Sequence, residues 1–218
     1  MTRATRPGVV PVFPLPDTVL FPHTILPLHV FEPRYRTMVR DAMAGDRSIA
    51  IALLCPGWEH EDVPSFHPIG TVGYISELEE LTDGRYLLNL TGRARVRFTE
   101  LPTDKPYRLA MAESLPEGEV DEESDDVRQD KLDLLSSYGY LVHELQNETS
   151  APLVLDESAS FVSAVNMACA RLPVEPGIRQ ELLEIDDLCA RHRRATAILQ
   201  GVLEAVLRLR ARPGTPVN

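Results

Sequence analysis

Hydrophobic and polar residues follow two different patterns along the chain, and the change comes near residue 113. Before this point, proline and glycine separate short runs in which apolar and polar residues alternate. After it, apolar residues recur at intervals of three and four, with few glycines. Alternation is typical of strands, and the longer period is typical of helices. The sequence therefore predicts a strand-rich part followed by a helical part.

The chain up to residue 31 carries prolines among its apolar residues, which argues against a helix there. Proline has no N–H to donate to a sheet, so this pattern predicts short extended segments or edge strands. A helix is predicted to begin at Pro33 and to end near Gly45. The apolar residues at helical spacing between them are Tyr35, Met38, Val39, Ala42 and Met43.

Further strands are predicted on both sides of a tight turn. Residues 48–54 form a short apolar run between glycine and proline, as a buried strand would. Runs at 69–81 and 85–98 flank Asp83-Gly84, a pair that favours the positive φ angles of a hairpin turn. One more strand is predicted around 107–111. About six short strands and one early helix predict a small, mostly antiparallel barrel.

Four helices are predicted in the second part, at about 126–147, 160–172, 176–185 and 187–210. Ser158 or Ser160 suits the N-cap of the second of these helices. Their apolar stripes call for a helical bundle. The predicted class is therefore α+β, with a barrel subdomain over residues 1–112 and a bundle subdomain over residues 127–212.

Between these parts, residues 113–126 carry eight acidic side chains and no basic one. Such a block repels itself, which predicts a solvated linker. The whole chain has 33 acidic and 22 basic residues and a formal charge of −11. Setting the eight acids aside leaves 25 acidic and 22 basic residues, so the remainder is close to neutral. The acidity makes nucleic acid an unlikely ligand but does not exclude a local basic patch.

Motifs of common catalytic and nucleotide-binding sites are missing. The sequence contains no GxxxxGK[ST], GxGxxG, GxSxG or HExxH pattern. Its two lysines, Lys105 and Lys131, lie in polar surroundings, which disfavours a Ser-Lys hydrolase. The histidines and acids of the loop 58–68 lack the spacing of a metal site. We therefore predict no catalytic residue, no metal and no cofactor.

Other features bear on where the protein is found. No stretch is long and apolar enough to span a membrane, and residues 1–11 lack the apolar core of a signal peptide. The three cysteines show no CxxC spacing, which predicts free thiols. We expect a soluble, cytoplasmic protein with no membrane partner.

Arg93, Arg95 and Arg97 alternate with apolar residues along a predicted strand. Three like charges on one face of a strand are unfavourable unless acids lie opposite. The favoured partners are the glutamates across the hairpin, Glu77, Glu79 and Glu80. The alternative is that the arginines recognise a carboxylate or a phosphate.

The proline-rich segment from Phe13 to Phe31 predicts edge strands whose backbone groups an extended peptide could pair with. The sequence VFPLPDTVLFPHTILPLHVFEPRYR resembles the start of the Lon substrate-binding domain. That domain is the amino-terminal domain of the ATP-dependent Lon proteases, and it also occurs in stand-alone proteins and in cereblon. The later GTVG, DGRY, GRARVR and LLEIDDL runs fit the same family, so the resemblance covers about residues 9–210.

The resemblance implies a PUA-like pseudo-barrel followed by a helical bundle. In full-length Lon this region helps to select unfolded or degron-bearing proteins and to organise the hexamer, whereas ATP hydrolysis and peptide cleavage belong to later domains. Those domains are missing from these 218 residues. We therefore expect a non-catalytic protein-binding module whose partners are unfolded or degron-bearing polypeptides and Lon protease itself. Because PUA-like folds often contact RNA, RNA binding is the alternative function.

The expected peptide site lies in the densest part of the resemblance. Apolar contact is expected from Phe21, Pro22, Phe31 and Tyr35, and orientation of the peptide from Glu32, Arg34 and Arg36. Each side chain also has a structural interpretation. The aromatic rings suit a core, Glu32 suits a helix N-terminus, and Arg34 suits a local salt bridge.

Overall fold

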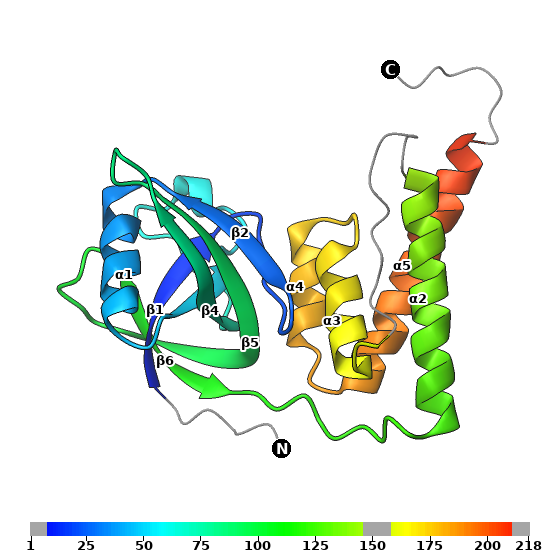
Figure 1. The fold of residues 1–218 in the computed structure, drawn as a ribbon. Coiled ribbons are helices and arrows are strands. Elements are labelled where there is room, and N and C mark those ends of the chain that lie inside the picture. The colour runs from blue at the N-terminus through cyan, green and yellow to red at the C-terminus, as the bar shows by residue number, and fades with distance from the viewer. Residues whose placement is uncertain (1–7, 146–157, 211–218) are drawn as a thin grey trace.

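The structure is a computed structural model that describes residues 8–145 and 158–210. A barrel lies beside a group of helices (Figure 1). The strands are β1 (Gly8–Leu15), β2 (Ile25–Val30), β3 (Ser48–Leu53), β4 (Ile69–Glu80), β5 (Tyr86–Leu101) and β6 (Arg108–Ser114). The helices are α1 (Pro33–Ala44), α2 (Asp125–Leu145), α3 (Phe161–Arg171), α4 (Pro176–Glu184) and α5 (Leu188–Arg210), with a 3₁₀ turn at Trp58–His60. The predicted α+β class, with one early helix and the other helices last, is confirmed.

The barrel closes through β5, the longest strand, which pairs with three neighbours. Its first part, residues 86–91, pairs with β2, and its last part, residues 96–101, pairs with β6. β4 pairs with β5 along most of its length, with two register irregularities. The circle is completed by β4–β3, β3–β1 and β1–β6, and of these pairings β3–β1 is parallel. The prediction of a mostly antiparallel barrel is confirmed.

β1 lies between two strands, although its prolines suggested the edge of a sheet. Pro11 falls in the stretch 8–12, which pairs with β6, whereas Pro14 falls in the stretch 12–15, which pairs with β3. Each proline therefore has a neighbouring strand on one side only. A missing N–H is tolerated there as it is at a sheet edge. The prolines thus indicated correctly where β1 lacks a hydrogen-bonding neighbour, but they did not show that the strand lies between β3 and β6.

α1 packs its apolar side against the barrel. Pro33 occupies its first turn, and its buried residues are Tyr35, Met38, Val39 and Ala42, as predicted. The ring centroids of Tyr35 and Phe13 are 4.2 Å apart. In Figure 1, α1 lies on the side of the barrel away from the other helices. The ends of β2 and of the β4–β5 hairpin are close to this helix, which positions them for the site described below.

α2 and α5 run side by side in the same direction (Figure 1). Near their starts, Asp130 of α2 lies 3.6 Å from His192 of α5. Near their ends, the backbone carbonyl of Glu144 accepts a hydrogen bond from Arg210. α3 and α4 lie between this pair and the barrel. Of the two predicted N-caps, Ser158 or Ser160, the structure selects Ser160, whose hydroxyl accepts from the backbone N–H of Ser163.

One hydrophobic cluster, the shared core, extends from the barrel into the helices, beside two clusters formed by the barrel and α1. Phe21, from the loop after β1, is fully buried and packs in one cluster with side chains of α2, α3, α4 and α5. Ile69, at the start of β4, belongs to the same cluster. The helices therefore pack directly against the barrel, and this contact fixes how the two parts lie relative to each other.

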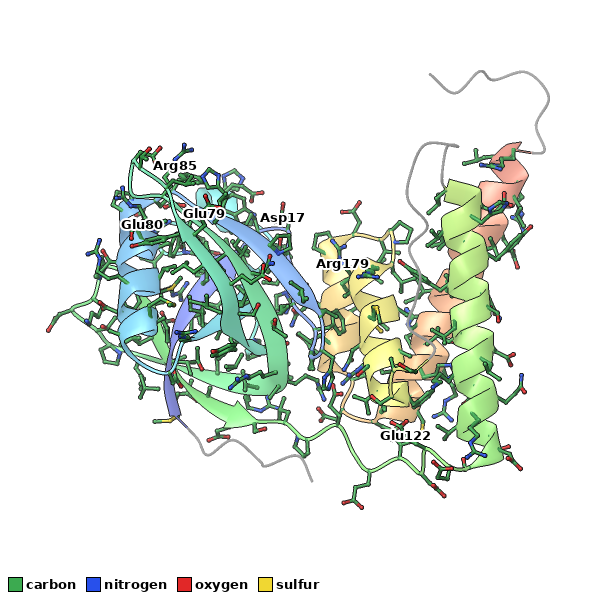
Figure 2. All side chains as sticks on the ribbon, in the orientation of Figure 1. Asp17, Glu79, Glu80, Arg85, Glu122 and Arg179 are labelled. Carbon is green, nitrogen blue, oxygen red and sulfur yellow. The ribbon has the colours of Figure 1, made fainter. Side chains whose placement is uncertain are left out.

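Seven of the eight acids in the segment 113–126 are exposed, as in a solvated linker, but two of the eight also bind groups of α3 and α5. The carboxylate of Glu117 accepts hydrogen bonds from Arg191 and Asn166, and only 14% of that side chain is exposed. Glu122 accepts from the N–H of Phe161 at the start of α3, where the helix dipole favours a carboxylate (Figure 2). A run of acids reveals its charge but not which distant groups balance it. The division into subdomains stays a prediction.

Candidate functional site

The residues expected to bind peptide separate into a buried group and an exposed group. Phe21, Pro22 and Tyr35 are buried. Phe21 packs in the core shared with the helices, and Tyr35 packs between α1 and β1. Phe31, in contrast, is 59% exposed. Only the exposed group is open to a ligand in this structure, and the buried rings serve packing.

The charged members of the set lie around the start of α1. Arg34 pairs with Glu32 at 2.9 Å, and its guanidinium lies 4.5 Å from the centroid of the Tyr35 ring. Glu32 is the N-cap residue of α1, but its side chain makes no capping hydrogen bond. Arg36 lies under the β4–β5 turn, where a Cβ added to Gly84 would come within 2.1 Å of the guanidinium. Arg36 therefore supports the turn, whereas Glu32 and Arg34 remain at the surface.

A group of exposed apolar side chains covers the outer face of β2 and β5. We call Ile25, Pro27, Phe31 and Leu87 the apolar face. Ile25 is 63% exposed and Leu87 is 41% exposed. Because His29 lies opposite Leu87 in the register, the odd-numbered residues of β2 share a side with Leu87. The ring of His29 also lies 5.8 Å from that of Phe31, which extends the face toward α1.

An open hollow of about 500 Å³ lies beside this apolar face. Its lining comes from three neighbouring strands and comprises Pro27, Leu28, His29, Glu77, Leu78, Glu79, Leu87, Leu88 and Asn89. Glu77 accepts a 2.6 Å hydrogen bond from Asn89. Figure 2 shows Glu79 and Glu80 at the hairpin end of the barrel. Among the ion pairs of the described residues, none involves these three glutamates, so the rim of the hollow carries uncompensated negative charge.

The arginines of β5 do not pair with those glutamates, and the prediction that they would is wrong. The register places Arg95 opposite Thr71, whereas Glu77 lies opposite Asn89. The glutamates therefore face the first half of β5 and the arginines occupy its second half. In an antiparallel hairpin the residues nearest the turn pair with one another, so the separation follows from the position of the turn.

Each arginine instead has its own surroundings. Arg93 lies over the ring of Tyr74, 4.3 Å from its centroid, and Arg97 is exposed. Arg95 is fully buried and donates hydrogen bonds of 2.7 Å to the carbonyl of Leu183 and to Asp186. Burial lowers the pKa of Arg95 from its usual value. Arg95 therefore joins the barrel to the helices and is closed to an external anion, while the other two remain accessible.

A second hollow, of about 520 Å³, lies between the barrel and the helices, and we call it the cleft. The barrel side is lined by Asp17, Thr18, Val19, Leu20, His23, Thr24, Ile25 and Leu26. The helical side is lined by Met167, Ala170, Arg171 and Arg179. In Figure 2, Asp17 on the barrel and Arg179 on α4 face each other across this gap. Ile25 and Leu26 begin β2, so the cleft continues into the apolar face.

The histidines, acids and lysines considered for metal binding or catalysis form no such site among the described residues. In the two described ranges, no three His, Cys, Asp or Glu side chains gather as a metal site would require. His67 lies 3.1 Å from Glu184, and Lys105 lies 2.7 Å from Asp41. No helix in the described part of the chain is both long and apolar enough to cross a bilayer.

The sequence that forms the barrel and the helices matches a known protein family. Residues 9–201 match the ATP-dependent protease La (LON) substrate-binding domain. The chain belongs to this family. It is 26% identical to a Lon protease of Rhizobium meliloti over 96% of its length, and 28% identical to one of Desulfosudis oleivorans over 93%. It spans about a quarter of the length of these relatives, 26% and 25% respectively.

Solved structures of Lon amino-terminal domains share the fold. The N-terminal domain of the Mycobacterium avium complex Lon protease superposes with a TM-score of 0.65 at 15% identity, covering 88% of this chain and 98% of that one. The Lon N-terminal domain protein from Xanthomonas campestris superposes with a TM-score of 0.57 at 26% identity, with the same coverage. The Lon-type architecture expected from the sequence motifs is therefore confirmed.

In this Lon substrate-binding domain, the sequence did not reveal several residues of the two hollows. Ile25 and Leu87 stand in runs that are apolar on both faces of the strand, so no polar alternation marked them as exposed. Arg171 ends α3, where a cation also suits the helix dipole. No sequence motif or pattern marked Arg179. The signal of these residues is tertiary. Ile25, Arg171 and Arg179 come together only where the barrel meets the helices, and Leu87 joins a hollow only where β2, β4 and β5 lie side by side.

Proposed function

We propose that this Lon substrate-binding domain is a non-catalytic module that binds exposed, extended polypeptide segments on the apolar face. The observation that carries the proposal is the exposure of Ile25, Phe31 and Leu87 beside a hollow of about 500 Å³. Large apolar side chains grouped at the surface commonly mark sites of contact with another protein. Aromatic side chains, phenylalanine among them, are also enriched in the buried centres of such contacts.

The edge of β2 gives this face a second means of holding a peptide. β2 pairs with β5 on one side, and no other strand of the described residues pairs with it. An extended segment can add to such an edge through backbone hydrogen bonds. Pro27 removes one donor from the strand and so limits uncontrolled pairing. The glutamates on the rim favour segments that carry basic as well as apolar side chains.

The ligands that we propose are unfolded or degron-bearing polypeptides in the cytoplasm, with Lon protease itself as a partner. Support comes from the family, whose description names substrate binding, and from relatives that are named as whole Lon proteases. ATP hydrolysis and peptide cleavage are not part of the proposal, since the matched region is the substrate-binding domain.

RNA binding has less support. It would rest on the arginines of β5, but Arg95 is buried against the helices and Arg93 lies over an aromatic ring. Phosphate contacts need several accessible cations on one surface. The hollow beside the apolar face is lined by glutamates instead.

The proposal is tested by fluorescence anisotropy with a labelled, reduced and carboxymethylated protein that stays unfolded. The wild-type chain is expected to bind it. The double variant Phe31→Ser, Leu87→Ser is expected to bind at least fivefold more weakly, roughly the effect of losing one or two apolar contacts at an interface.

The matched control is Leu132→Ser, which removes a leucine that is 50% exposed on α2, far from the apolar face. This variant is expected to bind as the wild type does. Urea unfolding of all three proteins checks that the substitutions leave the fold intact. The proposal is wrong if the wild type does not bind the unfolded protein, or if the control and the double variant lose affinity equally.

A further inference from the structure

The cleft between the barrel and the helices holds two guanidinium groups that lack anionic partners. Arg171 ends α3, and Arg179 lies on α4 across from Asp17. Among the described residues neither arginine forms an ion pair. Arg179 donates one long hydrogen bond, 3.5 Å, to the backbone carbonyl of Asp17. Its Nε is buried and has no partner within that part of the chain.

The single acid of the cleft does not balance these charges. The carboxylate of Asp17 accepts a 2.9 Å hydrogen bond from Thr18 rather than from either arginine. The cleft is therefore positive in a chain whose formal charge is −11. A buried donor without an acceptor costs free energy, so an anionic group entering the cleft would gain charge-assisted hydrogen bonds.

Both walls of the cleft also carry apolar side chains, beside Thr18, His23 and Thr24 on the barrel wall. Met167 and Ala170 line the helical wall, while Val19, Leu20 and Ile25 line the barrel wall. A ligand that fits here carries an anionic group and an apolar side chain close together. The last residue of a polypeptide has both, because its α-carboxylate and its side chain leave the same carbon atom.

β2 connects the cleft with the apolar face. Ile25 and Leu26 line the cleft, whereas Pro27, Leu28 and His29 line the hollow on the outer face. Four residues of extended chain span about 13 Å, so one short segment beside β2 can reach both. The charges at the two ends are opposite, with arginines in the cleft and Glu77 and Glu79 on the rim.

Building on the proposed function, we propose that this domain recognises the carboxyl-terminal end of a polypeptide. Arg171 and Arg179 bind the terminal carboxylate, and the last side chain fills the apolar part of the cleft. The ligand then runs antiparallel to β2, which is a favourable pairing at a strand edge. A basic side chain about four residues before the last one reaches the glutamates of the rim.

The test uses a labelled ten-residue peptide that ends in leucine, with lysine four residues before the end and a free carboxylate. A second peptide is identical except for a terminal amide. The wild-type chain is expected to bind the free acid about tenfold more tightly than the amide, as loss of a charge-assisted bond implies. The double variant Arg171→Gln, Arg179→Gln is expected to abolish this preference. The matched control Arg194→Gln, an exposed arginine of α5, is expected to keep it.

The possible results separate this inference from the proposed function. If acid and amide bind equally, and the Phe31→Ser, Leu87→Ser variant weakens both, the apolar face binds peptide but the cleft does not read a carboxylate. If the preference survives in the double arginine variant, the arginines are not its source. Each of these results overturns the inference.

Discussion

Arg95 of β5 donates a 2.7 Å hydrogen bond through Nε to the carbonyl oxygen of Leu183, in the last turn of α4. The guanidinium is fully buried, and its Nη2 also reaches Asp186 at 2.7 Å. A charged side chain in the wall of the barrel thus satisfies a backbone acceptor of the helical part. The contact depends on both parts being folded together.

Replacing Arg95 by alanine is expected to lower the free energy of unfolding by about 2–4 kcal/mol, because it leaves a buried carbonyl without a donor and creates a cavity. Urea unfolding followed by circular dichroism measures the change. Arg97→Ala, two residues along the same strand but exposed, is expected to change stability by less than about 0.5 kcal/mol. Equal effects of the two substitutions would contradict the role given to Arg95.

Gly92 of β5 lies against the loop that precedes β2. A Cβ at this position would come within 2.2 Å of the carbonyl oxygen of Phe21, so the backbone would have to move. Gly92→Ala is expected to destabilise the protein by about 1–3 kcal/mol, as overpacking does. Gly139→Ala provides the contrast, since Gly139 is exposed within α2 with open space around it. That substitution is expected to stabilise by about 0.5–1 kcal/mol in thermal unfolding, through helix propensity.

His192 makes the stability depend on pH. Burial lowers the pKa of His192 below its usual 6.5, and the nearby carboxylate of Asp130 offsets this only in part. The unfolded chain therefore binds a proton at a higher pH than the folded chain does. The stability associated with neutral His192 is present above pH 6.5 and is lost as the pH falls toward the lowered pKa.

Unfolding free energies measured by urea titration between about pH 7.5 and pH 5.5 check this expectation. The wild type is expected to lose stability on acidification, and His192→Gln is expected to lose less. His60→Gln, which changes an exposed histidine, is expected to follow the wild-type curve. An unchanged slope in the His192 variant would show that other groups govern the pH dependence.

Cys169 is expected to be unreactive in the folded protein. Burial raises the pKa of the Cys169 thiol to about 12, so almost none of it is thiolate near neutral pH. Cys55 and Cys189 are only partly buried. Titration with 5,5′-dithiobis(2-nitrobenzoate) should therefore detect fewer than three thiols rapidly in the native state and all three in urea. Cys169→Ser should leave the rapid native count unchanged, and a lower native count would contradict this assignment.

Local patterns along the chain predicted most of the elements. The spacing from Tyr35 to Ala42 predicted α1, and the Asp83-Gly84 pair predicted the hairpin. The serines at 158 and 160 predicted the start of α3 to within two residues. Each of these features depends on residues that are close together in the sequence. Such signals can be read from the sequence because the physical interaction is itself local.

The surface was harder to predict, because burial depends on what covers a strand face. Arg95 and Arg97 share one face of β5, but α4 contacts only Arg95. Arg93 stands at a register irregularity and lies over Tyr74 instead. Phe21 and Phe31 both follow short apolar runs, yet the helices cover the first and leave the second exposed. The alternation of apolar and polar residues assigns a residue to one face of a strand. Only the tertiary contact between the barrel and the helices decides whether that face is exposed to solvent.

The shared core also affects how the chain can be divided. A fragment that ends at residue 112 would retain Phe21 and Ile69 but lose the helical side chains that cover them. It would also leave Arg95 without the carbonyl that it serves. Newly exposed aromatic and aliphatic surface of this kind promotes self-association. An isolated barrel is therefore expected to aggregate, and the smallest unit that unfolds cooperatively includes α2, α3, α4 and α5.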